Sequence, residues 1–138
     1  VVRLVGSEMC IRDRFSNPLP TTVAASAEMA IRILQEEPER VERLRANVER
    51  ARSGIRDAGF EVLDSPTAIC PIIVGDTARA IRLSERLLEK GVFVIGFGYP
   101  VVPEGEARLR VQISAAHTDE HIDRLVHALR ELQAEEEA

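Results

Sequence analysis

Two arginines and a glutamine alternate along a segment near the C-terminal end of the chain. Arg108, Arg110 and Gln112 lie two residues apart, so a strand would project all three from one face. The intervening apolar residues, which would face the other way, are Leu109, Val111 and Ile113. A guanidinium binds a carboxylate through two parallel, charge-assisted hydrogen bonds, so a strand arginine is a candidate carboxylate clamp. A solvated surface residue would show the same pattern, and spacing alone leaves both interpretations of Arg110 open.

The histidines and the single lysine are the next candidates for chemistry. His117 and His121 are four residues apart, but His117 precedes the predicted start of a helix, and no acidic ligand completes a metalloprotease pattern. We therefore predict no metal site, and we place His121 and His127 on the polar face of that helix. Lys90 is predicted in the last turn of another helix, where a cation suits the helix dipole. It is expected to be a surface residue, because a Schiff-base lysine needs a desolvated pocket.

The cysteines and glycines do not complete a known catalytic motif. Cys10 and Cys70 lack the spacing of metal ligands, and Cys70 lies in an apolar run, which favours a buried structural thiol. Gly96, Gly98 and Gly105 are not followed by the helix of a dinucleotide-binding fingerprint. We expect them to permit a tight turn or a close approach of the backbone.

Length and charge limit the class of protein. A chain of 138 residues with 45% apolar residues suits one compact domain or part of a larger protein. The net charge of −5 and the mixing of both signs argue against a nucleic-acid partner. No apolar run approaches the ~18 residues of a membrane span, and no signal segment is visible. The expected location is the cytoplasm.

Apolar periodicity predicts the elements that position the arginine strand. The predicted helices begin near Thr21 or Thr22, Glu39, Asp76 or Thr77, and Thr118. The predicted strands are Phe60–Leu63, Ala68–Val74, Val92–Phe97 and Ala107–Ser114. This order favours an α+β fold, a mainly antiparallel sheet with helices packed on one face. Within it, we expect Val92–Phe97 to be buried and Pro71, which lacks an N–H, to mark a sheet edge or a bulge.

The clearest helical pattern lies between Glu39 and Ala58. Its apolar seam repeats every three or four residues, and it comprises Val41, Leu44, Val48, Ala51, Ile55 and Ala58. Gly59 and Gly91 are predicted to end their helices in the left-handed conformation. The last helix carries a similar stripe, formed by Ile122, Leu125, Val126, Leu129 and Leu132.

The first residues of the chain show no such order. Val1–Arg14 has neither a clear period nor capping residues, and we expect a non-native leader. The alternative is a short strand at Val1–Val5 within a genuine linker. In either case the predicted domain spans residues 15–138.

The segment Gly96–Thr118, GFGYPVVPEGEARLRVQISAAHT, resembles the C-terminal domain of the α-oxoamine synthases, a group of fold-type-I pyridoxal-phosphate enzymes. Within that group it is most similar to the glycine C-acetyltransferases, also called 2-amino-3-ketobutyrate coenzyme A ligases. Shorter matches are Phe15-Ser16-Asn17, Ala58-Gly59-Phe60, Pro71 and Gly75-Asp76, so the resemblance runs from Phe15 to about Leu132.

The resemblance implies roles for four residues. Arg110 would hold the substrate carboxylate, and Arg108 would be structural. Ser16 and Asn17 would reach the phosphate of the pyridoxal phosphate bound by the other subunit of a homodimer. The Schiff-base lysine would lie upstream of Phe15, so this chain would carry no catalytic residue and would be inactive alone.

The implied reaction joins glycine and acetyl-coenzyme A to give 2-amino-3-oxobutyrate and coenzyme A, on the route of threonine degradation. Two alternatives stay open. One is a sister enzyme, 8-amino-7-oxononanoate synthase, against which the Tyr99–Pro103 turn and Gln112 favour the glycine C-acetyltransferases. The other is a non-catalytic module that binds amino acids or mediates dimerisation. Glu104 departs from the basic residue expected at that turn position.

Overall fold

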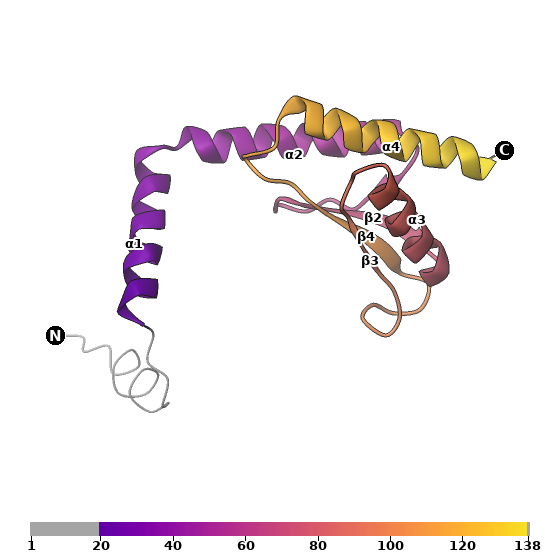
Figure 1. Ribbon diagram of the computed structural model, residues 1–138, viewed down its shortest axis with the longest axis horizontal. Helices are drawn as coiled ribbons and strands as arrows, with labels where there is room; N and C mark the ends of the chain where they lie inside the picture. Colours follow the sequence, from indigo (N-terminus) through magenta and orange to yellow (C-terminus); the bar gives the residue numbers. More distant parts are fainter. Residues whose placement is uncertain (1–19, 138) are drawn as a thin grey trace. The chain divides into compact units, whose positions relative to one another are not determined.

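The computed structural model describes residues 20–137, which divide into two compact units between Pro38 and Glu39. The first unit contains one helix, and the second contains three helices and a four-stranded sheet (Figure 1). The elements are α1 (Thr21–Glu36), α2 (Glu39–Asp57), β1 (Glu61–Val62), β2 (Ile69–Gly75), α3 (Thr77–Glu89), β3 (Ile95–Phe97), β4 (Ala107–Gln112) and α4 (Asp119–Glu137).

Helix α1 starts one residue earlier than a threonine cap would place it. Pro20 occupies the N-cap position, and no side chain caps the helix, so the predicted cap at Thr21 or Thr22 is wrong. The carbonyl of Pro20 accepts hydrogen bonds from the Val23 and Ala24 N–H groups, at 3.0 and 3.1 Å, and so begins the helix. The helix ends at Glu36, before Pro38, as expected from the clash of proline with a continuing helix. None of its residues is buried.

Helix α2 shows the predicted seam. Val48, Ala51 and Ile55 are buried within the helix, and Ala58 is buried directly after it. The helix then stops at Gly59, whose φ of +88° lies in the left-handed region that favours glycine.

The four strands form one antiparallel sheet in the order β1-β2-β4-β3. Strand β4 lies between β2 and β3, and Arg110 is paired with Pro71 on one side and Ile95 on the other. The two strands that meet β4 are distant in sequence, so the surroundings of Arg110 are a product of the fold.

Pro71 is not at a sheet edge, because β2 is an interior strand, and the irregularity of β2 lies between Ile73 and Gly75. The prediction of an edge or bulge at Pro71 is therefore wrong. The carbonyl of Pro71 accepts a hydrogen bond from the Leu63 N–H at 3.0 Å, so the missing donor also faces β1. Strand β1 is only two residues long, and its ladder ends there. The sheet tolerates proline at this position because the N–H group that it lacks would point toward the end of the short strand β1.

Strand β3 is shorter and more exposed than Val92–Phe97 was expected to be. It covers three residues at the sheet edge, with Ile95 47% exposed, and Phe93 before it is 76% exposed. Only Val94 of this segment is buried. The apolar run predicted burial, but an edge strand with one covered face buries only alternate side chains.

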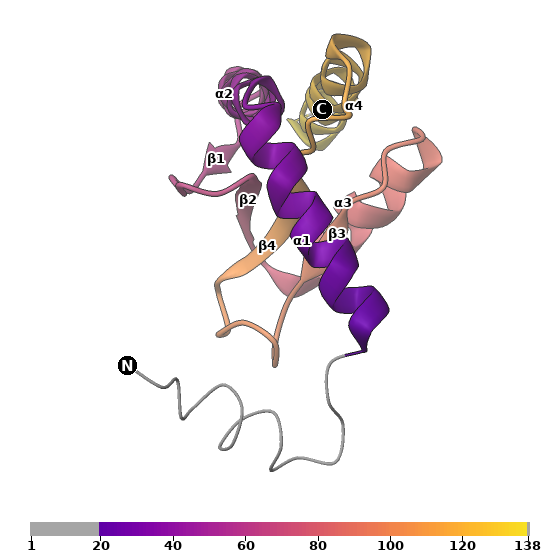
Figure 2. The ribbon, with the colours of Figure 1, turned by 90° about the vertical axis from the view of Figure 1, so that its left-hand side faces the viewer.

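Helices α2, α3 and α4 all pack on one face of the sheet (Figure 2). The shared core joins strand residues such as Ile72 and Leu109 to helix residues such as Leu87 and Leu129, each fully buried. The predicted stripe of α4 is buried throughout. The α+β class and the one-sided helical layer are confirmed, and the other face of the sheet carries Arg108, Arg110 and Gln112.

Candidate functional site

Strand β4 directs the predicted clamp out of the core. Ala107, Leu109 and Val111 are at most 4% exposed, whereas Arg110 and Gln112 are exposed on the opposite face. The alternation expected from the sequence is confirmed, because the buried set anchors β4 under the helices and fixes the outward direction of the polar set.

Arg108 and Arg110 share this face but differ in their partners. Arg108 donates from Nε to the Glu106 carbonyl at 3.2 Å and pairs with the Glu106 carboxylate at 3.0 Å. Arg110 forms no hydrogen bond or ion pair with another residue among those the structure describes. Its cross-strand neighbours, Pro71 and Ile95, have no side-chain group that could accept a hydrogen bond from it. The guanidinium of Arg110 is thus left available to a ligand.

Close backbone contacts hold the β3–β4 hairpin against α3. A Cβ on Gly96 would lie 2.8 Å from the Ala80 carbonyl oxygen, and one on Gly98 would lie 2.2 Å from the Thr77 methyl group. Gly105 instead has φ +84° and serves the turn before β4. The close approach of the backbone at Gly96 and Gly98 and the tight turn at Gly105 are therefore both present, as predicted. The close approach holds β3 in its place beside Arg110.

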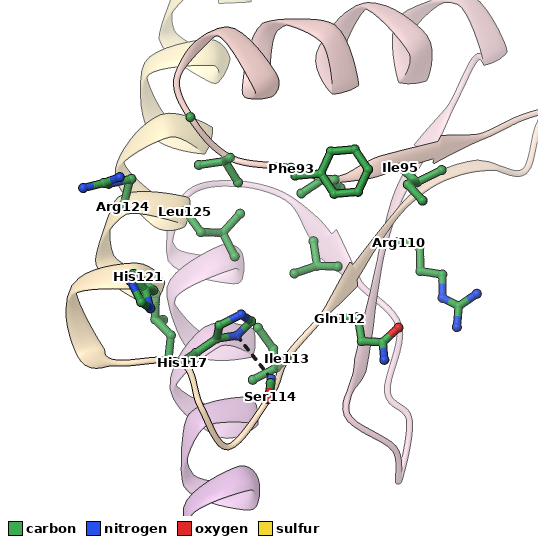
Figure 3. Close-up of a pocket in the computed structure, with 15 residues that line it drawn as sticks. Phe93, Ile95, Arg110, Gln112, Ile113, Ser114, His117, His121, Arg124 and Leu125 are labelled. Atoms are coloured by element: carbon green, nitrogen blue, oxygen red, sulfur yellow. Dashed lines mark hydrogen bonds between the residues drawn. The ribbon is translucent and has the colours of Figure 1, made fainter. Parts of the chain in front are cut away.

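A cleft of about 720 Å³ opens beside this strand. It lies between residues 91–95, the end of β4 and the first turns of α4, and we call it the α4 cleft (Figure 3). Arg110 and Gln112 stand at one side, and Arg124 of α4 stands at the other. Residues 92–94 do not continue the β3–β4 ladder, which leaves the cleft open.

His117 and His121 line the same cleft and stabilise the start of α4. The Nδ1 atom of His117 accepts the Ser114 N–H at 3.2 Å, and the Nδ1 atom of His121 accepts the Thr118 N–H at 3.2 Å. His121 occupies the third helical position, so it replaces the glutamate of a capping box. His127, as predicted, is exposed on α4.

Lys90 follows the last residue of α3 and pairs with α4. Its Nζ lies 2.8 Å from Glu131 Oε2, and this hydrogen bond raises the pKa of Lys90 above its ordinary value. A lysine that must lose its proton to react needs the opposite shift. The structure agrees with the prediction that Lys90 is not a Schiff-base lysine, and its side chain is 25% exposed.

Cys70 is fully buried in the core, and burial raises the pKa of its thiol. A thiol with a raised pKa carries little thiolate, so Cys70 is structural, as expected. Within residues 20–137, no three histidine, cysteine, aspartate or glutamate side chains gather into a metal site, and no helix there is long and apolar enough to cross a membrane.

Asn47 supports the site and was missed by the sequence patterns. It is the buried polar residue of α2, and its Nδ2 donates to the carbonyls of Ser114 and His117 at 3.1 and 2.9 Å. These bonds hold the connection from β4 to α4. Its position beside Val48 on the buried seam was the available signal, because a polar residue there needs internal partners.

Ser16 and Asn17, the predicted cofactor contacts, lie outside the described residues. Their roles stay a prediction. The structure thus brings Arg110 and Gln112 to the same cleft as His117 and His121.

The chain matches the model of the aminotransferase class I and II family over residues 2–129. That match spans most of the chain, and the chain belongs to this family. The family and the relatives below imply pyridoxal phosphate as the cofactor of the full-length enzyme.

Within this family, the similar proteins are α-oxoamine synthases. The chain is 45% identical over 118 residues to the mitochondrial 2-amino-3-ketobutyrate coenzyme A ligase of Mus musculus, covering 86% of this chain and 28% of the relative. It is 46% identical over 115 residues to the 8-amino-7-oxononanoate synthase of Thioalkalivibrio sulfidiphilus, covering 83% and 29%. The α-oxoamine synthases, the group expected from the resemblance, are thus confirmed. The two identities are too similar to decide between a 2-amino-3-ketobutyrate coenzyme A ligase and an 8-amino-7-oxononanoate synthase.

Solved structures agree with the fold. A serine palmitoyltransferase from Sphingomonas wittichii superposes with a TM-score of 0.80 at 30% identity, over 88% of this chain and 31% of that chain. A PLP-bound serine palmitoyltransferase from S. paucimobilis also superposes with a TM-score of 0.80, at 28% identity. The chain spans less than a third of the length of these relatives.

The described residues do not form a complete site for pyridoxal phosphate. The chain has one lysine, Lys90, and its ammonium group is bonded to Glu131 rather than directed to the open face of β4. What the described residues offer is a free guanidinium at Arg110. The position of the Schiff-base lysine upstream of Phe15 stays a prediction.

Proposed function

We propose that this chain is the C-terminal domain of a glycine C-acetyltransferase and that Arg110 binds the carboxylate of glycine. The observation that supports this role is the contrast on β4, where Arg108 is paired with Glu106 and Arg110 has no partner among residues 20–137. The reaction would join glycine to acetyl-coenzyme A, giving 2-amino-3-oxobutyrate and coenzyme A. The proposal includes a cytoplasmic homodimer in which Ser16 and Asn17 contact the cofactor phosphate of the partner subunit.

The part of Arg110 in this reaction would be orientation. Two parallel hydrogen bonds fix the plane of a carboxylate, and they thereby fix the directions of the bonds at the attached α-carbon. Holding the bond to hydrogen in the reactive direction favours loss of that proton over loss of carbon dioxide. Correct orientation of this kind can lower a barrier by several kcal/mol. Gly96 and Gly98 contribute by holding β3, and with it Ile95, beside the arginine.

Kinetics of the full-length enzyme carrying this domain test the role of Arg110. Arg110→Ala should raise the glycine KM about 10- to 100-fold, because it removes charge-assisted hydrogen bonds. Arg110→Lys should recover part of the loss, since it keeps the charge but not the fork. Arg108→Gln is the matched control on the same strand face and should leave the glycine KM unchanged. Unaltered glycine kinetics in Arg110→Ala would refute the assignment.

The sister activity, 8-amino-7-oxononanoate synthase, is the second candidate because a relative of that name is 46% identical. Its nine-carbon product requires an acyl donor longer than acetyl-coenzyme A. Comparing kcat/KM for acetyl-coenzyme A and longer acyl thioesters separates the two, and a preference for long donors would replace the first proposal.

The domain boundary at Phe15 belongs to the same proposal. Residues 15–138 would follow a large cofactor-binding domain, and residues 1–14 would be non-native. Sequencing the source DNA upstream of Phe15 tests this directly. A reading frame without a cofactor-binding domain before Phe15 would contradict both the boundary and the enzymatic assignment. In the same way, the 138-residue chain alone should show no pyridoxal-phosphate absorbance.

A further inference from the structure

A second cavity lies between helices α2 and α4, which run side by side in the same direction (Figure 1). Their neighbours show this direction, since Arg50 meets Asp123 early in both helices, and Gly59, directly after α2, lies opposite Gln133. The volume of the cavity is about 430 Å³, within the range of about 300–1,000 Å³ that small-molecule pockets occupy. We call this cavity the α2–α4 groove.

Charges of both signs line the groove, and some of them are neutralised within the protein. Arg50 of α2 reaches across to Asp123 of α4 at 2.8 Å, and it also pairs with Asp119 at 2.9 Å. Val126, which is 8% exposed, packs against Gly54 and provides an apolar floor. The groups that remain for a ligand therefore lie further along the two helices.

Asp57 and Arg130 line the groove one turn beyond Gly54 and Val126, and both are exposed. Neither forms a hydrogen bond or an ion pair with another residue among 20–137. On its own helix, neither has an opposite charge three or four residues away, where a side chain could reach it. The two helices thus present an unpaired carboxylate and an unpaired guanidinium to one cavity.

The position of Asp57 is unfavourable for a carboxylate. Asp57 is the last residue of α2, where the free carbonyl groups of a helix carry partial negative charge. The neighbouring cation, Arg56, does not compensate for this, because it pairs with Asp64 at 2.5 Å. A residue that breaks a local rule without an internal compensation is typical of a functional position. A bound cation beside Asp57 would supply the missing compensation.

We propose that the α2–α4 groove binds a zwitterionic amino acid. Its ammonium group would pair with Asp57, its carboxylate would accept hydrogen bonds from Arg130, and its side chain would lie over Val126. A ligand with only negative charge would be repelled by Asp57, and one with only positive charge would be repelled by Arg130. A ligand that carries both charges satisfies both groups. This site is separate from Arg110, and the proposal does not depend on the role of that residue.

Titration of the isotope-labelled 138-residue chain, followed by NMR, tests the proposal. The ligands are L-leucine, N-acetyl-L-leucine, which lacks the ammonium group, and L-leucinamide, which lacks the carboxylate. L-Leucine should bind with a Kd of about 1–10 mM and shift the amide signals of residues 53–57 and 126–130. Each blocked derivative should bind at least about tenfold more weakly, because it loses one charge-assisted contact.

Two variants locate the charged groups. Asp57→Asn and Arg130→Gln should each weaken L-leucine binding by about tenfold. Asp57→Asn also removes an unfavourable charge from the end of α2, so this variant should melt no lower than the wild type. A loss of binding without a loss of stability separates ligand contact from a structural role. Glu49→Gln and Arg45→Gln, at exposed positions of α2 outside the groove, are the matched controls and should bind like the wild type.

Four results would overturn the proposal. They are equal binding of L-leucine and either derivative, wild-type affinity in either groove variant, signal shifts confined to other residues, and no binding by the folded chain. If the spectrum shows that the chain alone is unfolded, L-leucine binding by the longer enzyme and by its Asp57→Asn variant decides the question, and equal affinities would again contradict the site. An unchanged glycine KM in Arg110→Ala would leave these outcomes unaffected, so the two proposals fail separately.

Discussion

At the scale of single residues, identical side chains on one strand face have different partners because their neighbours differ. Arg108 has Glu106 two residues before it in the turn, and the carboxylate neutralises its guanidinium. Arg110 lies between Pro71 and Ile95, neither of which carries an acceptor in its side chain. An arginine that the protein leaves unpaired next to a cleft is a better candidate for ligand binding than one with an internal partner.

Asn47→Ala should destabilise the protein by about 1–3 kcal/mol, because it removes the side-chain donor of the His117 carbonyl and one of the two donors of the Ser114 carbonyl. The measurement is the free energy of unfolding from urea titration. Arg45→Ala, an exposed residue on the same helix, should change it by less than about 0.5 kcal/mol. A loss in Asn47→Ala no larger than in that control would show that Asn47 does not hold the β4–α4 connection.

At the scale of elements, α2 and α4 pack closely because Gly54 has no side chain. A Cβ at this position would lie 2.5 Å from a methyl group of Val126, which is 8% exposed. The valine cannot easily move away, since a β-branched side chain has one strongly preferred rotamer in a helix. The close contact positions the N-terminal turns of α4, where the basic side of the α4 cleft is formed.

Gly54→Ala should therefore cost about 1–3 kcal/mol of stability through overpacking. The same change in a Val126→Ala background should cost much less, because the added methyl group then occupies the space vacated by valine. A double-mutant cycle by urea denaturation measures this coupling. Equal costs of Gly54→Ala in the two backgrounds would contradict the close approach of the helices.

At the scale of the whole second unit, ion pairs join α3 to the C-terminal half of α4. Arg79 donates to Glu136 at 3.1 Å, Arg86 pairs with Glu135, and Lys90 pairs with Glu131. The hydrogen bond from Arg79 holds the pKa of Glu136 below its ordinary value of 4.5, and the bond from Lys90 lowers the pKa of Glu131 in the same way. The charged forms of these carboxylates are thus favoured in the folded state.

These shifts predict acid sensitivity. A carboxyl group with a lowered pKa in the folded state contributes stability at pH values above 4.5, and the contribution is lost as the pH falls through the lower folded value. Arg79→Gln should weaken this dependence, so its melting temperature should fall less steeply below pH 4.5 than that of the wild type. Arg45→Gln provides the control. Parallel pH profiles for Arg79→Gln and wild type would exclude the contribution of this pair.

The sequence by itself determined the elements and the outward direction of the arginines. Periods of two and of 3.6 residues record which side chains face the core, and such patterns need no knowledge of distant contacts. They were sufficient for the strand at Arg110, the seams of α2 and α4, and the glycine stops. The motif in Gly96–Thr118 was sufficient for the family.

Only the tertiary structure decided that Arg108 has a partner and Arg110 has none among residues 20–137. It also placed Pro71 in an interior strand and brought Asn47 within hydrogen-bond distance of the Ser114 and His117 carbonyls. It also exposed Phe93 beside the edge strand β3 and formed the α4 cleft from residues that run from Gly91 to Leu125. The physical reason is that a partner or a missing partner depends on strand order and register. Those are set by packing between segments that are remote in sequence, which no local pattern records.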